Sequence, residues 1–204
     1  MDSPEFQHLN RLIKKDPTNI HAHLRRGIVL TAQDLSLALA DFDKVISLDP
    51  GCAEAYANRG LVHYRMGNPD RALQDYEVAL GINPKLAEVY FNRGLVRAQQ
   101  RDFNRAVTDY GKAILLNPNY HAAYNECARA LINLYSYVQA IESANKAIEL
   151  NPSFGSNYYY RAIAFDRLSE INKAKQDLQK AIALGLSASQ HSHAERLLDS
   201  LKNM

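Results

Sequence analysis

Two stretches that copy each other decide the fold: AEAYANRGLVHYRMGNPDRALQDYEVALGINP at residues 53–84 and AEVYFNRGLVRAQQRDFNRAVTDYGKAILLNP at residues 87–118. Asp-Pro and Asn-Pro pairs carry the same period through the chain, at Pro17, Pro50, Pro84, Pro118 and Pro152. Successive prolines are 33, 34, 34 and 34 residues apart. A fixed period of this length predicts supersecondary units that bury their apolar faces by stacking on their neighbours.

Small residues fall in fixed columns when the repeats are aligned on these prolines. The column in the first half of each repeat holds Gly27, Gly60, Gly94, Ala128 and Ala162. The column in the second half holds Ala38, Ala72, Ala106, Ala140 and Ala174. Two helices cross at close range only where neither presents a bulky side chain. The columns therefore predict an antiparallel helix pair in every repeat.

The pattern resembles that of the tetratricopeptide-repeat proteins, whose unit is a helix, a turn and a second helix. Tyr-x-x-Arg-Gly at 56–60 and 90–94 replaces the family's usual Trp-x-x-Leu-Gly, and about nine-tenths of the chain follows the pattern. The resemblance implies an all-α solenoid, a right-handed superhelix of antiparallel helix pairs. Repeats are expected at 20–52, 53–86, 87–120, 121–154 and 155–186. Pentatricopeptide arrays, which serve RNA, are the alternative architecture.

The two ends of the chain are expected to hold single helices. Residues 1–19 carry apolar residues at helical spacing followed by Asp-Pro, which is typical of the second helix of an incomplete repeat. This pattern is what a chain cut from a longer array would have, and the first residues could be native or partly a cloning scar. Residues 187–204 follow Gly185 and are expected to form a capping helix, because solenoids need terminal units that close the core.

Composition narrows the class of partner. The 24 basic and 22 acidic residues give a net charge of +2, which disfavours nucleic-acid and membrane binding. No apolar run approaches the roughly 20 residues that span a bilayer. Cys52 and Cys127 form no spacing motif, so a reduced, cytoplasmic or otherwise intracellular setting is expected.

Two further columns change together. Four repeats carry an Arg in the first half and an Asp in the second, whereas the fourth repeat has Cys127 and Ser143 at these positions. We predict structural ion pairs between Arg26 and Asp41, Arg59 and Asp75, Arg93 and Asp109, and Arg161 and Asp177. The alternative is a ladder of unpaired arginines for an acidic ligand.

The family resemblance implies a binding groove, because the first helices of such arrays line the concave surface. The exposed positions of these helices predict a peptide groove formed by Arg25, Asn58, Leu61, Tyr64, Arg65, Phe91, Asn92, Leu95, Asn125, Glu126, Arg129, Tyr159 and Tyr160. Amides can hold a peptide backbone while rings and aliphatic groups receive its apolar side chains.

Two binding modes known in the family each require particular residues at these positions. A clamp for the C-terminal carboxylate of chaperones needs Lys, Asn and Arg where this chain has Leu24, Ile28, Asn58, Glu88 and Asn92. Only Asn58 matches, which argues against that partner. An asparagine ladder needs Asn at the sixth position of successive repeats, and Asn58 and Asn92 supply two rungs. The alternative is that Asn is simply common at this position.

Other candidate sites are weaker. The pairs His21 and His23, and His191 and His193, point to different helix faces, so no metal site is expected. No catalytic residue and no cofactor is predicted. Tyr158 is expected in the core, whereas Tyr159 and Tyr160 are expected either in the groove or against the last helix.

These observations predict a non-catalytic protein-interaction scaffold or adaptor that binds a peptide or a partner helix, of unknown identity, in the concave groove. Two alternatives remain open. The chain could be the substrate-recruiting segment of a larger enzyme, or a structural solenoid that self-associates through its ends.

Overall fold

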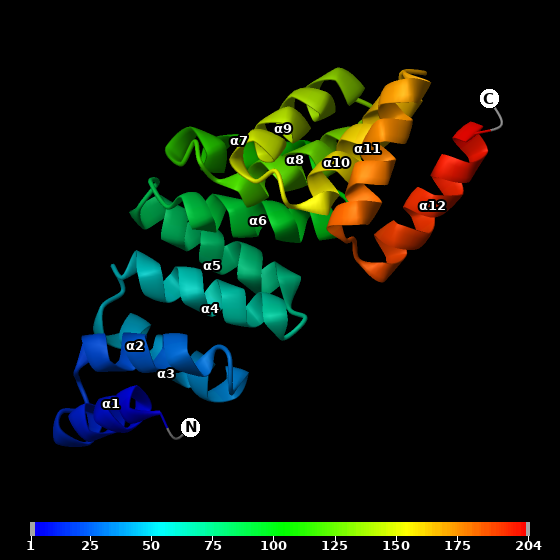
Figure 1. Ribbon diagram of the computed structural model, residues 1–204. Coiled ribbons are helices and arrows are strands. Elements are labelled where there is room, and N and C mark those ends of the chain that lie inside the picture. The colour runs from blue at the N-terminus through cyan, green and yellow to red at the C-terminus, as the bar shows by residue number, and fades with distance from the viewer. Residues whose placement is uncertain (1–2, 203–204) are drawn as a thin grey trace. The chain divides into compact units, whose positions relative to one another are not determined.

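The computed structural model describes residues 3–202, and all the regular secondary structure in this range is helical. The helices are α1 (Pro4–Lys15), α2 (Ile20–Leu30), α3 (Leu35–Leu48), α4 (Ala53–Arg65), α5 (Pro69–Ile82), α6 (Ala87–Gln99), α7 (Phe103–Leu116), α8 (His121–Asn133), α9 (Tyr137–Leu150), α10 (Gly155–Arg167), α11 (Ile171–Leu184) and α12 (Ala188–Lys202) (Figure 1). They form two compact units, an N-terminal unit up to Val96 and a C-terminal unit from Arg97.

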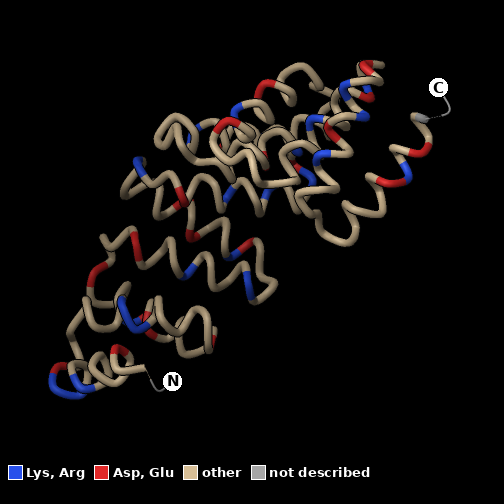
Figure 2. Tube along the Cα trace, in the orientation of Figure 1, with Lys and Arg blue, Asp and Glu red and all other residues tan. Residues whose placement is uncertain are grey.

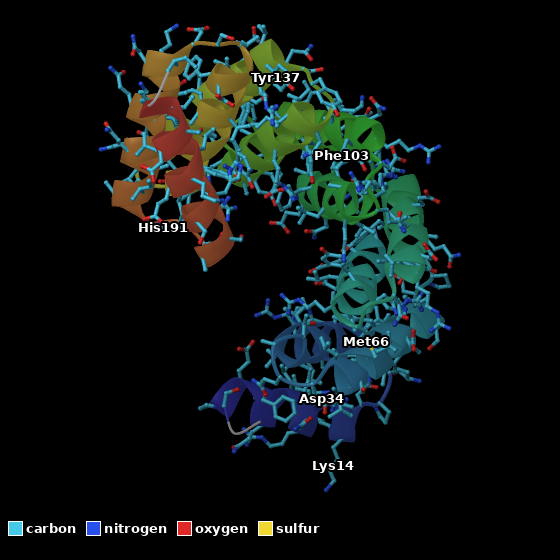
Figure 3. All side chains as sticks on the ribbon, turned by 90° about the vertical axis from the view of Figure 1, so that its right-hand side faces the viewer. Lys14, Asp34, Met66, Phe103, Tyr137 and His191 are labelled. Carbon is cyan, nitrogen blue, oxygen red and sulfur yellow. The ribbon has the colours of Figure 1, made fainter. Side chains whose placement is uncertain are left out.

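Each repeat contains two helices, which we call its first and second helix. In the N-terminal unit α2 packs on α3 and α4 on α5, and in the C-terminal unit α8 packs on α9 and α10 on α11. The turn that contains Met66 joins α4 to α5 (Figure 3). The predicted all-helical, tetratricopeptide-like architecture is confirmed. The division into repeats by residue number stays our proposal.

The residues before the repeated prolines end the second helices. The C-caps of α3, α5, α7 and α9 are Asp49, Asn83, Asn117 and Asn151. Asp49 has φ −138° and ψ 91°, and its N–H still donates to the carbonyl of Val45. A following proline excludes the helical conformation at these residues, so the helix must stop there.

Close helix crossing explains the small residues of the first helices. A Cβ atom added at Gly27 would lie 2.7 Å from Cε1 of Phe42, and one added at Gly60 would lie 2.8 Å from Cε1 of Tyr76. Both rings are fully buried. The second helix therefore brings a large ring against the backbone of the first, and a side chain at either glycine would push the pair apart.

Two hydrophobic clusters of the N-terminal unit hold its helices together. One contains Phe6, Leu24, Phe42 and Val62, and so joins α1 to α4. The other joins α4, α5 and α6 around Tyr76 and includes Val89 and Val96.

In the C-terminal unit the last helix covers the final repeat. Ala194 and Leu201 of α12 are buried in one cluster with Leu178 of α11. The chain reaches α12 through Gly185, whose φ of 92° is a conformation that favours glycine.

Candidate functional site

The first-helix surface of the N-terminal unit is built on α2, α4 and α6. Asn58 and Asn92 are half-buried at equivalent positions of α4 and α6. The side-chain nitrogen of Asn58 donates to the carbonyl of Glu54 at 2.8 Å, within its own helix. Within the described part of the chain, the Asn58 side-chain oxygen accepts no hydrogen bond and the Asn92 amide makes none. Both amides can therefore bond to a ligand without breaking a contact between helices.

Apolar side chains flank these two amides. Leu61, Tyr64, Phe91 and Leu95 are each half-buried. Tyr64 packs against the cluster around Tyr76 that also contains residues of α6. Half-buried groups held by a packed core offer apolar area in a fixed position, which is what a peptide side chain requires.

The two predicted arginines of this surface are tied to neighbouring helices. Arg25 pairs with Glu5 of α1 at 3.1 Å, and both side chains are about half exposed. Arg65 donates from Nη1 to the carbonyl of Thr31 at 2.9 Å. Exposed contacts of this kind contribute little stability and can be exchanged for contacts with a ligand.

In the C-terminal unit, side chains of the equivalent surface are largely engaged in contacts with neighbouring helices. Asn125 is only 5% exposed, and its Nδ2 donates to Oδ1 of Asn157 at 2.7 Å. Asn157 is fully buried and donates to the carbonyls of Ala147 and Asn151, each at 3.0 Å. Asn125 therefore connects α8 to α10 through a buried hydrogen bond. Sequence reasoning did not single out Asn157, because one buried asparagine leaves no repeated pattern.

The predicted charges of α8 bind each other. Nε of Arg129 donates to Oε2 of Glu126 at 2.7 Å. Burial is the largest influence on the pKa of Arg129 and lowers it, but Glu126 and other partners outweigh burial and raise this pKa overall. This ion pair remains partly accessible, with the Arg129 side chain 42% exposed.

The three tyrosines of α10 differ in their surroundings. Tyr158 is half-buried, packs against the hydrophobic cluster that contains Leu178, and donates its hydroxyl proton to the carbonyl of Pro152, so it lies at the edge of the core to which it was assigned. Tyr159 is the buried ring, 8% exposed, and its hydroxyl lies 2.9 Å from Nδ1 of His193. A helix turns about 100° per residue, so adjacent tyrosines cannot share one face.

Tyr160 contacts the same last helix. Its hydroxyl accepts from Nε2 of Gln190 at 3.2 Å, and burial raises the pKa of Tyr160 to about 12. Tyr159 and Tyr160 were expected either in the groove or against the last helix, and both contact the last helix, α12.

Three arginines of the first helices form clamps, which we define as the contacts of one arginine with two second helices. Nε and Nη2 of Arg59 bind the two carboxylate oxygens of Asp75 at 2.9 and 2.7 Å. Nη1 of the same arginine binds Oδ1 of Asp43, in the preceding repeat, at 2.7 Å. The hydrogen bond to Asp75 is the main cause that raises the pKa of Arg59.

The same geometry recurs at both ends of the array. Arg26 binds Asp41 through Nε and Nη2 and Asn10 through Nη1, and Arg161 binds Asp177 and Asn145 in the same way, all at 2.7 to 2.8 Å. The clamps thus act both within a repeat and between repeats. Sequence reasoning missed the third member, although Asn10, Asp43 and Asn145 each stand 16 residues before their arginine.

In repeat three the aspartate of this column, Asp109, has Arg97 as a partner. Asp109 accepts a hydrogen bond from Nη1 of Arg97 at 2.8 Å. The guanidinium of Arg93 lies 5.5 Å from the ring centroid of Tyr90, a cation–π distance. The pair of Arg93 with Asp109 stays a prediction.

Repeat four lacks all three members of the clamp. Cys127 stands in place of the arginine, Ser143 in place of the aspartate, and Gly111 in place of the third member. Cys127 is 7% exposed, and burial raises the pKa of its thiol, whereas a hydrogen bond with Ser143 acts in the opposite direction. A Cβ added at Gly111 would meet no atom within 4 Å.

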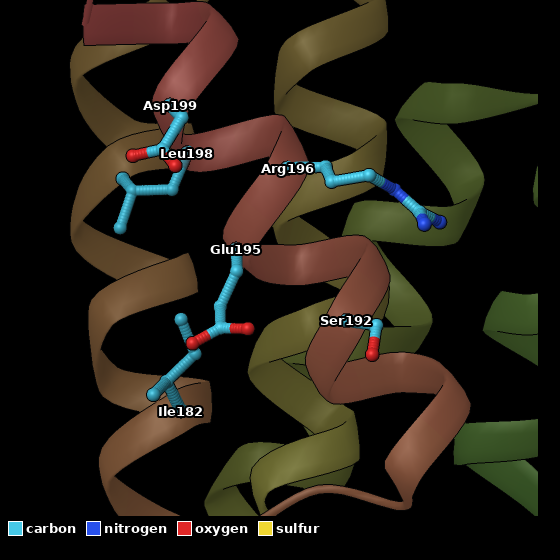
Figure 4. Close-up of a pocket in the computed structure, with 6 residues that line it drawn as sticks. All are labelled: Ile182, Ser192, Glu195, Arg196, Leu198 and Asp199. Atoms are coloured by element: carbon cyan, nitrogen blue, oxygen red, sulfur yellow. The ribbon is translucent and has the colours of Figure 1, made fainter.

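A pocket of about 550 Å³ lies beside α12, away from these residues. Ile182 of α11 and Ser192, Glu195, Arg196, Leu198 and Asp199 of α12 line it (Figure 4). These six residues include none of the predicted groove. Among residues 3–202 no group of three or more potential ligands could hold a metal ion. No helix in the same range is long and apolar enough to cross a membrane.

Comparisons with known proteins agree with this geometry. Profiles of the tetratricopeptide repeat match residues 24–85 and 87–120. No curated protein matches the chain at a significant level. The repeat profiles and the helix pairs together identify the chain as a tetratricopeptide-repeat protein.

Solved structures share the fold at low sequence identity. YrrB, described as a TPR protein with an unusual peptide-binding site, has a TM-score of 0.78 and 22% identity, over 92% of this chain and 97% of that one. PilF of Pseudomonas aeruginosa has a TM-score of 0.75 and 19% identity, over 92% and 90%. MamA has a TM-score of 0.71 and 23% identity, over 76% and 90%.

Proposed function

We propose that the protein is a non-catalytic interaction scaffold that binds an extended or helical peptide of a partner protein on the first-helix surface of its N-terminal unit. The observation that carries this proposal is the pair of equivalent amides, Asn58 and Asn92, whose bonding capacity is not used between helices. Family membership supports it, because repeat arrays of this kind host interactions on extended surfaces.

The chemistry of the surface suits a peptide backbone. The side-chain oxygen of Asn58 can accept a peptide N–H, and the Asn92 amide can both donate and accept. Leu61, Tyr64, Phe91 and Leu95 then receive apolar side chains of the ligand. Arg25 and Arg65 border this surface and favour a ligand with acidic flanks.

Several other properties belong to the same proposal. The structural neighbour YrrB is described as peptide-binding, which fits a peptide ligand here. Lys and Arg are interspersed with Asp and Glu in both units, which does not favour a nucleic acid or a membrane surface (Figure 2). Cys52 and Cys127 are free, in keeping with an intracellular setting. No cofactor is included.

The test is binding of peptides selected from a random library against the whole protein. Asn58→Ala with Asn92→Ala removes both rungs, and Asn104→Ala with Asn172→Ala removes two exposed amides of second helices as a matched control. Fluorescence polarisation should show at least tenfold weaker binding to the first double variant and unchanged binding to the second. Equal binding to both variants would refute the amide ladder.

A further inference from the structure

Two clefts lie one repeat apart in the N-terminal unit, outside the first-helix surface. Cleft 1, about 380 Å³, is lined by residues of α1, α2 and α3. Cleft 2, about 310 Å³, is lined by residues of α3, α4 and α5. Each cleft therefore lies between successive second helices, with the intervening first helix contributing Arg26 or Arg59 of a clamp.

The two clefts are copies of one architecture. Phe6, Leu30, Leu37 and Asp41 of cleft 1 have Leu39, His63, Arg71 and Asp75 at the equivalent positions of cleft 2, 33 or 34 residues later. Asp41 and Asp75 are both neutralised by the clamps. The clefts differ in their walls, because apolar Leu30, Leu37 and Ala40 are replaced by polar His63, Arg71 and Gln74.

Each cleft presents one side chain that the fold does not use. Leu37 in cleft 1 is 47% exposed, which is high for a leucine beside a cavity. Arg71 in cleft 2 is exposed, and it makes no hydrogen bond or ion pair with any residue of the described range. Asp43, the nearest exposed carboxylate in the lining, is already held by Arg59. An unpaired guanidinium beside an amide, Gln74, complements a carboxylate.

His63 adds no further positive charge to cleft 2 at neutral pH, beyond those of Arg59 and Arg71. It is 8% exposed, and its Nδ1 is buried without a hydrogen-bond partner among the described residues. Burial lowers its pKa, as do Arg59 and Arg71, against the opposing influence of Asp75 and Asp43. With His63 neutral, the charged groups of cleft 2 are Arg59 and Arg71 against Asp43 and Asp75, and Arg71 is the one that is not held in an ion pair among the described residues.

We propose that clefts 1 and 2 are paired subsites for an extended segment of a partner protein, with an apolar side chain in cleft 1 and a carboxylate on Arg71 in cleft 2. Leu37 on α3 and Arg71 on α5 are separated by α4, so they lie between one and two helix spacings of about 10 Å apart, and an extended chain covers about 3.3 Å per residue. The two side chains are therefore about three to six residues apart in the ligand. This surface goes beyond the first-helix surface and uses none of its residues.

The probes are synthetic capped peptides with Leu and Glu about three to six residues apart, in both orders, and the same peptides with Gln in place of Glu. Titration into the ¹⁵N-labelled protein is followed by NMR. One order of the Glu peptide should shift the amide signals of Leu37 and Arg71, and the Gln peptide should bind about fivefold more weakly. No shift with either order, or equal binding of the Gln peptide, would overturn the proposal.

Variants locate the site on the protein. Arg71→Ala should remove the preference for Glu over Gln, and Arg71→Glu should reverse it toward a Lys peptide. Arg105→Ala is the matched control, because Arg105 has the equivalent position in the next repeat but pairs with Asp102 of its own turn. Loss of the preference in the Arg105 variant as well would contradict the assignment to cleft 2.

The two proposed surfaces can fail independently. Asn58→Ala with Asn92→Ala should leave binding of the Leu and Glu peptide unchanged, and Leu37→Ala should weaken it while leaving library peptides on the first-helix surface unaffected. All these side chains are at least partly exposed, so the variants are expected to fold. A shared loss of both activities would contradict the separation of the surfaces.

Discussion

The two units use the same repeat differently. On the first helices of the N-terminal unit, Asn58 and Asn92 keep unused bonding capacity, whereas at the equivalent positions of the C-terminal unit Glu126 pairs with Arg129 and Tyr160 accepts a hydrogen bond from Gln190 of α12. The scaffold is shared, but only the N-terminal unit leaves its amides for a ligand. Equivalent positions in a repeat thus acquire binding or structural roles according to what packs beside them.

The clamps show a second contrast, between repeat four and the others. Repeats one, two and five have a clamp, centred on Arg26, Arg59 and Arg161, whereas repeat four has replaced every member of the clamp. Replacing only one member would leave a buried charge without a partner, which costs more than removing the whole set. The joint change of Cys127, Ser143 and Gly111 follows this rule.

The largest effect is expected from breaking a clamp. Arg59→Ala leaves Asp75, whose side chain is 7% exposed, without its main partner. We expect a loss of about 3 kcal/mol in the free energy of unfolding, measured with urea. Cys127→Ala, at the same position of repeat four, should cost about 1 kcal/mol. Similar losses for the two variants would show that the clamp adds no stability beyond packing.

Asn157→Ala should cause the second-largest loss in the free energy of unfolding. It removes hydrogen bonds to Asn125 and to the carbonyls of Ala147 and Asn151, and leaves buried polar groups without partners. The expected loss is about 2 kcal/mol. Asn58→Ala should change the free energy of unfolding by less than about 0.5 kcal/mol. A large effect at Asn58 would indicate that this amide is structural and would remove the contrast between the units.

Rebuilding the clamp in repeat four sharpens the comparison. Gly111→Asn, Cys127→Arg and Ser143→Asp together should stabilise the protein by about 1 kcal/mol, because the space beside Gly111 is open and every new charge has a partner. Cys127→Arg alone should destabilise it. Gly111→Asn alone measures the change in helix propensity, which must be subtracted. If the triple variant were no more stable than Cys127→Arg alone, the three positions would not act together.

The smallest expected effect is a pH dependence of stability in repeat two. The pKa of His63 is lowered in the folded protein, so the unfolded chain binds the proton more tightly. Stability should therefore fall as pH drops below about 6.5 and level off below the folded pKa. His63→Leu, which copies Leu30, should reduce the difference in urea midpoint between pH 7 and pH 5. An unchanged difference would mean that His63 is not the group responsible.

The repeat architecture could be predicted from the sequence because the same pattern of residues occurs in five repeats. Glycines 27 and 60 and the residues before the prolines act through local sterics, which are the same in every repeat. The arginine and aspartate columns were visible for the same reason. The role of Asn157 and the choice of Tyr159 as the buried ring depend on contacts with residues 32 and 34 positions away along the chain. Each contact occurs once, so the alignment of the repeats does not reveal it. The differing walls of the two clefts likewise required the structure to show which side chains share a cavity.

The most direct test of the central claim is the affinity of library-selected peptides for the Asn58→Ala, Asn92→Ala double variant, compared with a variant of the C-terminal unit. Glu126→Gln with Arg129→Gln removes the accessible polar pair on the equivalent surface of that unit. We predict at least tenfold weaker binding for the first variant and wild-type affinity for the second. The reverse order would place the peptide site in the C-terminal unit and contradict the account.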